Sequence, residues 1–381
     1  MNFSYISLDP VPVTPPGPRS ADGVRTFEGI PGIEQIPSGR LFAVWYSGGY
    51  SEGYDNYALL KFSDDRGKSW SKTVAVVDPP APNVRAFDPA IWYAPNGKLY
   101  WFWAQGCGGF SDSTEIFDGI AGVWCSILEN PDDEAENFRF TPPRRIANGV
   151  MMNKPTVLKD GTWALPCSIW YSAKGKYLRH DSLGILHGAY MVVSTDEGEH
   201  FSVRGRIDAS QTEGGNSYDE HLFIERKDGT ICCYIRAARG IAESISTDGG
   251  VTWSKPELSK TLISPSSRFF LKRLRSGRLL AVINASSSKR ENLTALLSED
   301  DGLSWPYSLL LDPRTGVSYP DGTEGIDGIY LTYDRARYSG GYILMSRISE
   351  ADIMAGKVVT AGSVLNQEIA HSAPCAGKEA E

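Results

Sequence analysis

The stretch Ser246-Thr247-Asp248-Gly249-Gly250-Val251-Thr252-Trp253 decides the fold, because its pattern recurs along the chain. The pattern is Ser/Thr-x-Asp-x-Gly-x-Ser/Thr-Trp/Phe, and we call it the aspartate box. Further boxes occupy residues 63–70 and 298–305, and a weaker box at residues 194–201 has His200 where the second hydroxyl residue belongs. The last three boxes follow one another at a constant step of 52 residues. A fixed period of this length indicates a repeat architecture.

Each box has the composition of a hairpin turn. The aspartate can accept bonds from backbone N–H groups, the glycine supplies a positive φ, and the aromatic ring can pack over the turn. Further short runs rich in β-forming residues lie between the boxes, each starting at a polar turn, at residues 40–46, 98–103, 230–236 and 278–284. Four strands for about 50 residues is typical of one blade of a β-propeller.

The number of blades follows from the spacing of the turns. The first two boxes start 131 residues apart, which is too long for two regular blades, so a degenerate turn is expected near residues 126–140. A closing sheet is expected at about residues 327–349, with one short helical turn at residues 349–355. The sequence therefore predicts an all-β, six-bladed β-propeller with aspartate-box turns.

Length and charge set further limits. One propeller would use all 381 residues as a single domain, with irregular ends at residues 1–20 and 371–381. The formal net charge of −8 argues against nucleic acid as a partner, and the absence of any long apolar run argues against a membrane. The start of the chain lacks the pattern of a signal peptide, which predicts a cytoplasmic protein, or a secreted or periplasmic one if a leader has been removed.

The cysteines and aromatic residues give weaker signals. No Cys-x-x-Cys pair occurs, so buried thiols in a reducing compartment are expected, with no metal site and no cofactor. Ten tryptophans and 18 tyrosines suit β-sheets and also surfaces that stack on sugar rings. The six cysteines are Cys107, Cys125, Cys167, Cys232, Cys233 and Cys375.

Short segments rich in charged and aromatic residues stand just before the expected strands. In a propeller the innermost strand of every blade lines the axial funnel, so segments far apart in sequence converge there. The boxes are expected to hold the blades together at the outer rim, and we therefore look for the function in the funnel. The candidate segments occupy residues 28–34, 51–56, 85–89, 153–155, 218–221, 236–239, 289–290 and 317–322.

Through these segments the chain resembles the sialidase (neuraminidase) superfamily of aspartate-box propellers over nearly all of its length. In that family a glutamate precedes an inner strand, and an arginine follows on the same blade before a box. Glu220, Arg236 and the box at Ser246 stand in this order. A second arginine precedes the next box, where Arg290 stands, and a tyrosine follows that blade, where Tyr319 stands in Val-Ser-Tyr-Pro-Asp.

The resemblance implies an exo-acting glycoside hydrolase that releases a terminal acidic sugar, most simply a sialic-acid-like nonulosonic acid, from a glycan or glycoconjugate. Tyr319 would be the nucleophile and Glu220 its base, while Arg236 and Arg290 would clamp the carboxylate of the sugar. The residue types suit this chemistry, because a guanidinium pairs with a carboxylate through two parallel hydrogen bonds. A neutral phenol meets an anionic sugar without repulsion, but its ordinary pKa near 10 requires an adjacent base. Double displacement would retain the anomeric configuration.

The carboxylate clamp departs from the family pattern at one position. The family places its first clamp arginine in a Phe-Arg-Ile-Pro motif, whereas the matching segment here reads Glu-Gly-Ile-Pro, with Gly29 at the arginine position. Arg25, Arg85 or Arg268 is expected to replace the missing cation from elsewhere in the fold. If nothing replaces it, weaker action on ordinary sialic acid glycosides is expected.

The acid departs from the family pattern as well. The family uses an aspartate on the loop before the first box, where this chain offers Glu52 and Asp55 at displaced positions, with Glu52 favoured. His221 is a further candidate acid or base, because the ordinary pKa of histidine is near 6.5. Lys154 and Asp321 are expected to line the funnel as substrate-binding residues.

Other interpretations of the same residues stay open. Glu220 also fits a salt bridge at a blade edge, Tyr319 a packed core position, and the two clamp arginines pairs with carboxylates of neighbouring blades. Arg85 and Asp88 fit a structural pair. The alternative enzyme is a propeller lyase or hydrolase acting on a uronic acid or another glycan end, with His221 or Tyr319 as the base. The non-enzymatic alternative is a carbohydrate-binding propeller.

Overall fold

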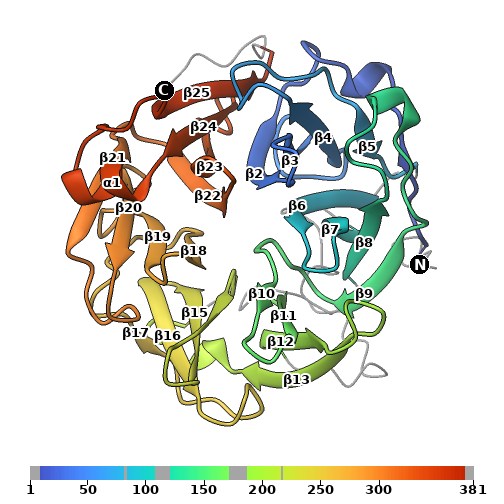
Figure 1. The fold of residues 1–381 in the computed structure, drawn as a ribbon. Coiled ribbons are helices and arrows are strands. Elements are labelled where there is room, and N and C mark those ends of the chain that lie inside the picture. The colour runs from blue at the N-terminus through green and yellow to red at the C-terminus, as the bar shows by residue number, and fades with distance from the viewer. Residues whose placement is uncertain (1–8, 81–83, 108–120, 171–186, 216–217, 374–381) are drawn as a thin grey trace.

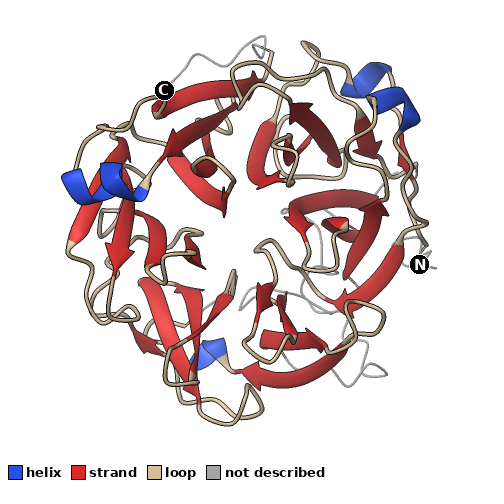
Figure 2. Ribbon diagram, viewed as in Figure 1, coloured by secondary structure: helices blue, strands red, loops and turns tan. Residues whose placement is uncertain are grey.

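The computed structural model of the protein describes residues 9–80, 84–107, 121–170, 187–215 and 218–373. Six antiparallel sheets stand around a central axis, and each contains four strands that follow one another in sequence (Figures 1 and 2). The predicted all-β propeller with six blades is therefore confirmed. Of the expected irregular ends, residues 1–8 and 374–381 lie outside the described residues, as do Cys375 and the side chain of Cys107.

The chain passes through the blades in order and runs from the axis outward in each (Figure 1). Blade one contains β2 (Glu28–Gln35), β3 (Leu41–Ser47), β4 (Tyr57–Ser63) and β5 (Ala75–Val77), and β1 (Val13–Thr14) adds an outer edge. Blade two contains β6 (Val84–Tyr93), β7 (Leu99–Cys107), β8 (Gly122–Leu128) and β9 (Arg144–Asn148). Blade three contains β10 (Thr156–Val157), β11 (Trp163–Ile169), β12 (Gly188–Ser194) and β13 (Ser202–Ile207).

The second half of the ring repeats this arrangement. Blade four contains β14 (Leu222–Glu225), β15 (Ile231–Ala237), β16 (Gly240–Ser246) and β17 (Glu257–Leu258). Blade five contains β18 (Phe270–Arg273), β19 (Leu279–Asn284), β20 (Leu293–Ser298) and β21 (Tyr307–Asp312). Blade six contains β22 (Val317–Glu324), β23 (Ile329–Arg335), β24 (Tyr342–Ile348) and β25 (Val364–His371), so the closing sheet is longer than expected.

The helices of the described residues are all short turns. The expected helical turn is α1 (Glu350–Ala355), which Ser349 caps by accepting the backbone N–H of Asp352 at 3.2 Å. Further 3₁₀ turns in the described part of the chain occupy Pro18–Ser20, Ala135–Asn137 and Ala209–Gln211. Within the described ranges we find no helix with the length and apolar character that crossing a membrane requires.

The aspartate boxes form the turns that leave the third strand of blades one, three, four and five. In blade four, Asp248 accepts the Ser246 hydroxyl at 2.8 Å and both the backbone N–H and the hydroxyl of Thr252, at 2.9 and 2.6 Å. In the weaker box, His200 makes the equivalent contact through Nδ1, 2.7 Å from Asp196. The expected degenerate turn lies between β8 and β9. Each box therefore fixes the path between two outer strands.

The apolar core is divided among the gaps between blades. A separate cluster of buried side chains fills each of the six gaps, and a seventh, around Phe27, Phe87 and Trp170, lies near the axis. Because every blade packs on both neighbours, the inner strands hold fixed positions around the axis. Among the described thiols, the buried ones are Cys125, Cys167, Cys232 and Cys233.

Blades one and six close the ring without sharing a sheet. β1 pairs with β5 inside blade one, and β25 pairs with β24 inside blade six. The seam therefore depends on the packing of β2 against β22 and on hydrogen bonds that cross it. Asp334 of blade six accepts the backbone N–H of Ile30 at 2.8 Å, and Asp321 accepts that of Ile33 at 2.9 Å.

Candidate active site

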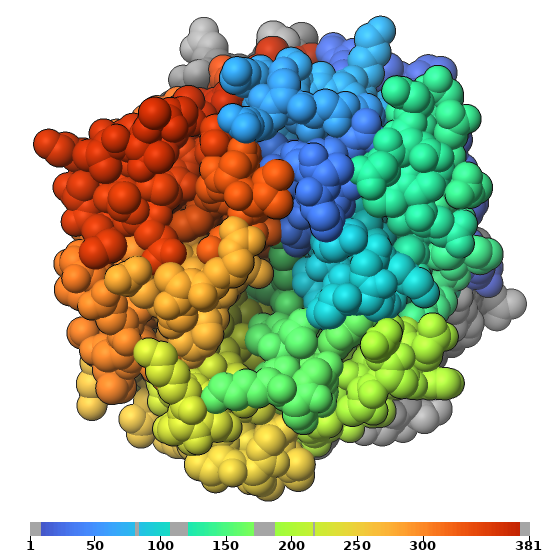
Figure 3. Space-filling model, in the orientation of Figure 1, coloured from blue at the N-terminus to red at the C-terminus, as the bar shows by residue number. Residues whose placement is uncertain are grey.

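A cavity of about 190 Å³ lies among the inner strands and the loops beside them. Figure 3 shows how closely the blades pack around the axis. Ile30, Phe87, Met152 and Trp170 form the apolar part of the wall. The polar part consists of carboxyl groups, guanidiniums and phenols from five blades, namely Glu52, Arg85, Asp88, Tyr218, Glu220, Arg236, Arg290, Tyr319, Arg337 and Tyr338. Such a convergence of titratable groups in a concave site marks a candidate active site.

Three inner strands each direct one residue into this cavity at a β-bulge. In β2, β6 and β22 the pairing register shifts where a residue with positive φ precedes a proline. These residues are Ile30 at 57°, Asp88 at 47° and Tyr319 at 57°. A bulge of this kind re-aims a side chain, and its left-handed backbone costs on the order of 1–3 kcal/mol, which the surrounding packing must offset. The three strands belong to consecutive blades, so the bulges gather on one half of the funnel.

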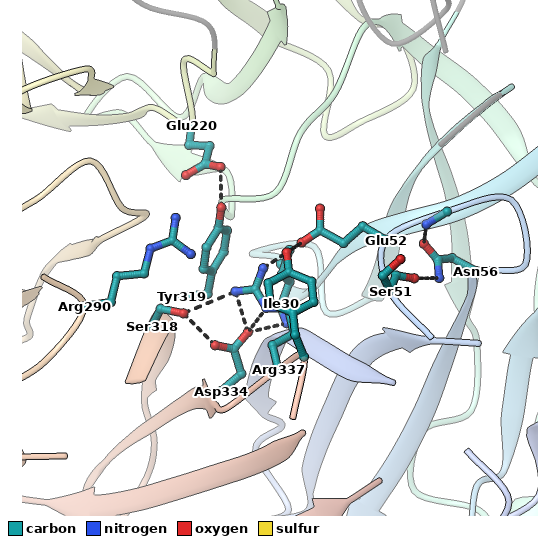
Figure 4. Close-up of polar contacts among 12 residues, drawn as sticks. Ile30, Ser51, Glu52, Asn56, Glu220, Arg290, Ser318, Tyr319, Asp334 and Arg337 are labelled. Atoms are coloured by element: carbon teal, nitrogen blue, oxygen red, sulfur yellow. Dashed lines mark hydrogen bonds and ion pairs between the residues drawn. The ribbon is translucent and has the colours of Figure 1, made fainter. Parts of the chain in front are cut away.

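The phenol of Tyr319 contacts the carboxylate of Glu220 directly. The hydroxyl donates to Glu220 Oε1 at 2.8 Å (Figure 4). Arg236 contacts both partners, because its Nη1 donates to Glu220 at 2.5 Å and to the Tyr319 oxygen at 2.9 Å. Burial raises the pKa of Tyr319 to about 12, although Arg236 opposes the shift. The phenol is therefore neutral at physiological pH, and a proton acceptor stands within hydrogen-bond distance of it.

Arg290 adds a second guanidinium beside the phenol. It lies 5.2 Å from the centre of the Tyr319 ring, and its Nη2 donates to the carbonyl oxygen of Ser266 at 3.4 Å. No ion pair joins Arg290 to a carboxylate in the described part of the chain. Its charge is therefore available to an anion that enters the cavity.

Glu52 reaches the cavity from the loop between β3 and β4. Its Oε1 accepts from Nη1 of Arg337 at 2.8 Å (Figure 4). The same oxygen accepts from the hydroxyl of Tyr338, also at 2.8 Å. Burial acts to raise the pKa of Glu52, but Arg337 and Arg85 outweigh burial and the pKa is lowered. Glu52 is therefore ionised at neutral pH. Asp55, the other candidate on this loop, is exposed and does not line the cavity.

Arg85 and Asp88 lie close together on β6 and both line the cavity. No ion pair joins them, in contrast to the structural pair that the sequence suggests, and neither side chain hydrogen-bonds to any described residue. The Arg85 guanidinium instead lies 4.1 Å from the centre of the Phe87 ring and 5.5 Å from that of Tyr46. Burial raises the pKa of Asp88 to about 8, although Arg85 opposes the shift, so Asp88 holds its proton at neutral pH.

Two residues of the cavity wall were not expected to have a role there: Asp88 was expected only as a structural partner of Arg85, and Arg337 was not a candidate. A signal for Asp88 exists, because Ile30-Pro31, Asp88-Pro89 and Tyr319-Pro320 repeat the same residue-proline step inside inner strands. No comparable signal marks Arg337, which reaches the cavity from the turn after β23.

Four candidate substrate-binding residues do not line this cavity. Arg25 is paired with Glu28 inside blade one. Arg268 and Lys154 both contact Asp321, at 3.5 and 3.3 Å, in a buried network that connects blades five, three and six. The expected funnel residues therefore divide into those that line the cavity and those that join the blades across the axis.

His221 is packed between strands and does not line the cavity. Its Nε2 lies 3.0 Å from the carbonyl oxygen of Tyr190, and its ring stands edge-on to Phe223 at 5.2 Å. Burial lowers the pKa of His221 to about 4, so the ring is neutral at physiological pH. Glu220 lines the cavity while His221 does not, as expected where side chains alternate along an extended segment.

The charge of the lining favours an anionic ligand. Four guanidiniums face three carboxyl groups among the described lining residues, and Asp88 holds its proton at neutral pH. The cavity thus combines a net positive charge with a neutral phenol, a carboxylate in contact with it and a protonated carboxyl group. These are the parts that covalent catalysis on an anionic substrate requires.

Comparisons with known proteins agree with this architecture. A family model described as a BNR repeat-like domain matches residues 39–331. The sialidase of Micromonospora viridifaciens is 27% identical over 195 residues, which cover 45% of this chain and only 30% of that sialidase.

Solved structures share the fold at low sequence identity. A Hadza microbial sialidase is 16% identical with a TM-score of 0.61, over 83% of this chain and 66% of that chain. The intramolecular trans-sialidase of Ruminococcus gnavus is 14% identical with a TM-score of 0.62, over 86% of this chain and 95% of that chain. Because the family model matches most of the sequence and the blades superpose on these propellers, the chain belongs to the BNR-repeat propellers of the sialidase superfamily.

Proposed function

We propose that this protein is an exo-acting glycoside hydrolase that releases a terminal acidic sugar from a glycan with retention of the anomeric configuration. The observation that carries the proposal is the 2.8 Å hydrogen bond from Tyr319 to Glu220 inside a positively charged cavity. A neutral phenol becomes a nucleophile only when a base removes its proton, and this contact supplies the base. The relatedness to proteins named sialidases and trans-sialidases supports the substrate class.

The reaction would proceed in two displacements. In the first, the Tyr319 oxygen bonds to the anomeric carbon while its proton passes to Glu220. The bond to the leaving oxygen breaks, and that oxygen takes a proton from an acid of the cavity wall. In the second, water gives a proton to that same group and attacks the anomeric carbon, and the Tyr319 oxygen leaves and regains its proton from Glu220. Two inversions give overall retention.

The guanidiniums beside the phenol would bind the carboxylate of the sugar. Arg290 has no carboxylate partner among the described residues, so an anion would satisfy it. Arg85 lines the same cavity, and its buried Nε has no hydrogen-bond partner in the described part of the chain. Arg236 contacts Glu220 and Tyr319, and it would both bind the sugar carboxylate and stabilise the charge that develops between its two partners. This supports an acidic sugar over a neutral one.

Two carboxyl groups could protonate the leaving oxygen. Asp88 is favoured by its protonation at neutral pH, whereas Arg337 and Tyr338 hold Glu52 in its ionised form. Substrates that differ only in the leaving group separate the two. Loss of the acid slows a methyl glycoside far more than a 4-nitrophenyl glycoside, because nitrophenolate departs without a proton. We expect this pattern for Asp88→Asn, and its appearance in Glu52→Gln alone would transfer the role to Glu52.

A panel of aryl glycosides tests the proposal as a whole. It contains 4-nitrophenyl glycosides of N-acetylneuraminic acid, of glucuronic acid and of neutral glucose. We expect turnover of an acidic member and none of glucose, with the released sugar first appearing in the starting anomeric form by nuclear magnetic resonance. Inversion, or turnover of glucose alone, would contradict the mechanism. Binding of an acidic sugar without turnover would favour a carbohydrate-binding propeller.

A further inference from the structure

Gly29 stands on β2 immediately before the bulged residue Ile30. A Cβ built on Gly29 would lie 2.7 Å from both Cγ and Cδ of Arg337 and 2.9 Å from its Nε. Unrelated carbon atoms do not approach this closely, so the two side chains cannot coexist without a shift. The backbone of Gly29 does not require glycine, because its φ lies outside the left-handed region. The presence of Arg337 is therefore what requires glycine at this position.

Arg337 comes from the turn after β23 in blade six, and its side chain crosses the seam to lie against Gly29 of blade one. Its Nε and Nη2 lie 2.9 and 2.8 Å from Asp334 Oδ2, and Nη2 also donates to the Ser318 hydroxyl at 3.2 Å (Figure 4). The same oxygen of Asp334 accepts the backbone N–H of Ile30. The guanidinium plane is thus fixed against both blades, and it lies 4.2 Å from the centre of the Tyr319 ring.

The guanidinium retains capacity for a further acceptor. A guanidinium carries five N–H groups, and the hydrogen bonds to Asp334, Ser318 and Glu52 together with the ion-pair contact of Nη2 with Asp334 use at most four of them. The remaining N–H is on Nη1, the nitrogen that contacts the cavity residue Glu52. Arg337 therefore combines a fixed orientation, contact with the nucleophile ring and an unused donor at the wall of the cavity.

We propose that Arg337 binds the carboxylate of the substrate together with Arg236 and Arg290, and that it supplies from blade six the cation that Gly29 does not supply from blade one. This inference rests on the proposed function. The three guanidiniums would then come from blades four, five and six. Of the replacements that the sequence suggests, Arg85 lines the cavity, but it is Arg337 that fills the space at Gly29.

Calorimetric binding tests this role without relying on turnover. The probes are N-acetylneuraminic acid and glucuronic acid, each compared with its methyl ester, which has the same shape without the charge. We expect wild type to prefer one acid over its ester. Arg337→Ala should lower the affinity for that acid ten- to hundredfold and change the affinity for the ester less than threefold. Arg337→Lys should bind the acid at an intermediate strength, because lysine keeps the charge but not the fork.

Arg335→Ala is the matched control. Arg335 ends β23, and its guanidinium lies 5.8 Å from the centre of the Tyr342 ring, while Arg335 does not line the cavity. We expect the Arg335→Ala variant to bind the acids and their esters with the same affinities as wild type. If Arg337→Ala keeps the full preference for the acid, the role of Arg337 is wrong while the proposed function stands. If wild type itself shows no preference for either acid over its ester, both proposals fail.

A reciprocal exchange tests the shared space and covers the case in which Arg337→Ala does not fold. Gly29→Arg alone should lower both the melting temperature and the affinity for the acid, because two arginines compete for one volume. Combining Gly29→Arg with Arg337→Gly should restore the preference for the acid to within about tenfold of wild type, a coupling that independent sites do not show. A single Gly29→Arg variant that folds and binds like wild type would contradict the inference.

Discussion

Burial acts to raise the pKa of Tyr319, Asp88 and Glu52 alike, but the net shift differs because their charged neighbours differ. It raises the pKa of Tyr319 to about 12 and that of Asp88 to about 8, although arginines oppose both shifts. At Glu52 the cations prevail and the pKa is lowered. Groups whose pKa values are moved apart in one site can divide the roles of nucleophile, acid and anion partner among them.

Replacing Glu220 with glutamine tests its role as the base for Tyr319. Glutamine keeps the shape of the side chain but accepts a proton poorly, so we expect kcat/KM to fall by about 10²–10⁴-fold on the best acidic aryl glycoside. Tyr319→Phe should cause a similar loss. Because both variants remove parts of one step, the double variant should be no slower than the slower single variant. Initial rates measure this, and near-normal turnover in either single variant would exclude the proposed nucleophile and base.

The raised pKa of Asp88 predicts a dependence of stability on pH. The ordinary aspartate pKa is about 3.9 in an unfolded chain, and the folded value is about 8, so the native state binds more protons between these values. The free energy of unfolding should therefore fall as pH rises from about 4 to about 8. Asp88→Asn should remove this contribution and stabilise the protein at pH 8 by on the order of a few kcal/mol.

Urea unfolding of wild type and Asp88→Asn at pH 5 and pH 8 measures this difference. The variant should gain more stability over wild type at pH 8 than at pH 5. An equal gain at both pH values would show that Asp88 ionises as an ordinary aspartate. Asp160→Asn offers a control, because Asp160 is exposed on a turn and the backbone N–H of Thr162 lowers its pKa.

Strands and turns differ in how far their sequences reveal them. An aspartate box can be recognised in the sequence because its contacts join residues four or fewer positions apart, as from Asp65 to Ser63 and Ser69. The bulges in β2, β6 and β22 are less apparent, because a residue before proline usually adopts an extended conformation rather than a positive φ. The sequence thus predicts where an inner strand lies but not which of its side chains the bulge turns toward the axis.

Replacing the aspartate of one box should separate stability from activity. Asp65 accepts the Ser63 hydroxyl at 2.8 Å and both the N–H and the hydroxyl of Ser69, at 2.9 and 2.6 Å. Asp65→Ala removes these bonds, and we expect the melting temperature to fall by on the order of a few degrees. kcat/KM should stay at the wild-type value, because no box residue lines the cavity. A large loss of kcat/KM with an unchanged melting temperature would place the box in the function.

For the molecule as a whole, the repeat spacing was enough to predict six blades, because each blade is built from residues close in sequence. The order of Glu220, Arg236, Arg290 and Tyr319 matches the pattern of the sialidase family, and this resemblance, together with the convergence of inner strands on the axis, predicts the one cavity that all four line. The sequence alone does not show which residue takes the place of the missing arginine. Arg337 meets Gly29 only because the last blade closes against the first. The two residues are far apart in the sequence, and no pattern in it indicates that they are in contact.

Lys154 offers a test of what holds the blades together across the axis. Its side chain is buried, with Nζ 3.2 Å from Glu34 and 3.3 Å from Asp321, and Nζ donates to the carbonyl oxygen of Gly322 at 2.9 Å. Lys154→Met would leave two buried carboxylates without this cation, so we expect a loss of about 3–5 kcal/mol in the free energy of unfolding. Lys159→Met is the control, because Lys159 is exposed. Equal urea midpoints for both variants would contradict a structural role for Lys154.

No sheet in the described part of the chain joins blades one and six, so the contacts across the seam between them form only when both blades are present. The bonds from Arg337 to Glu52 and from Ile30 to Asp334 join residues 285 and 304 positions apart. Contacts that close so long a loop form late, and in a chain emerging from the ribosome they must wait for the final blade. Tyr319, the proposed nucleophile, belongs to blade six, whereas Glu52 belongs to blade one. We therefore expect the proposed activity to be absent from a partly made propeller and to appear in one step when the ring closes.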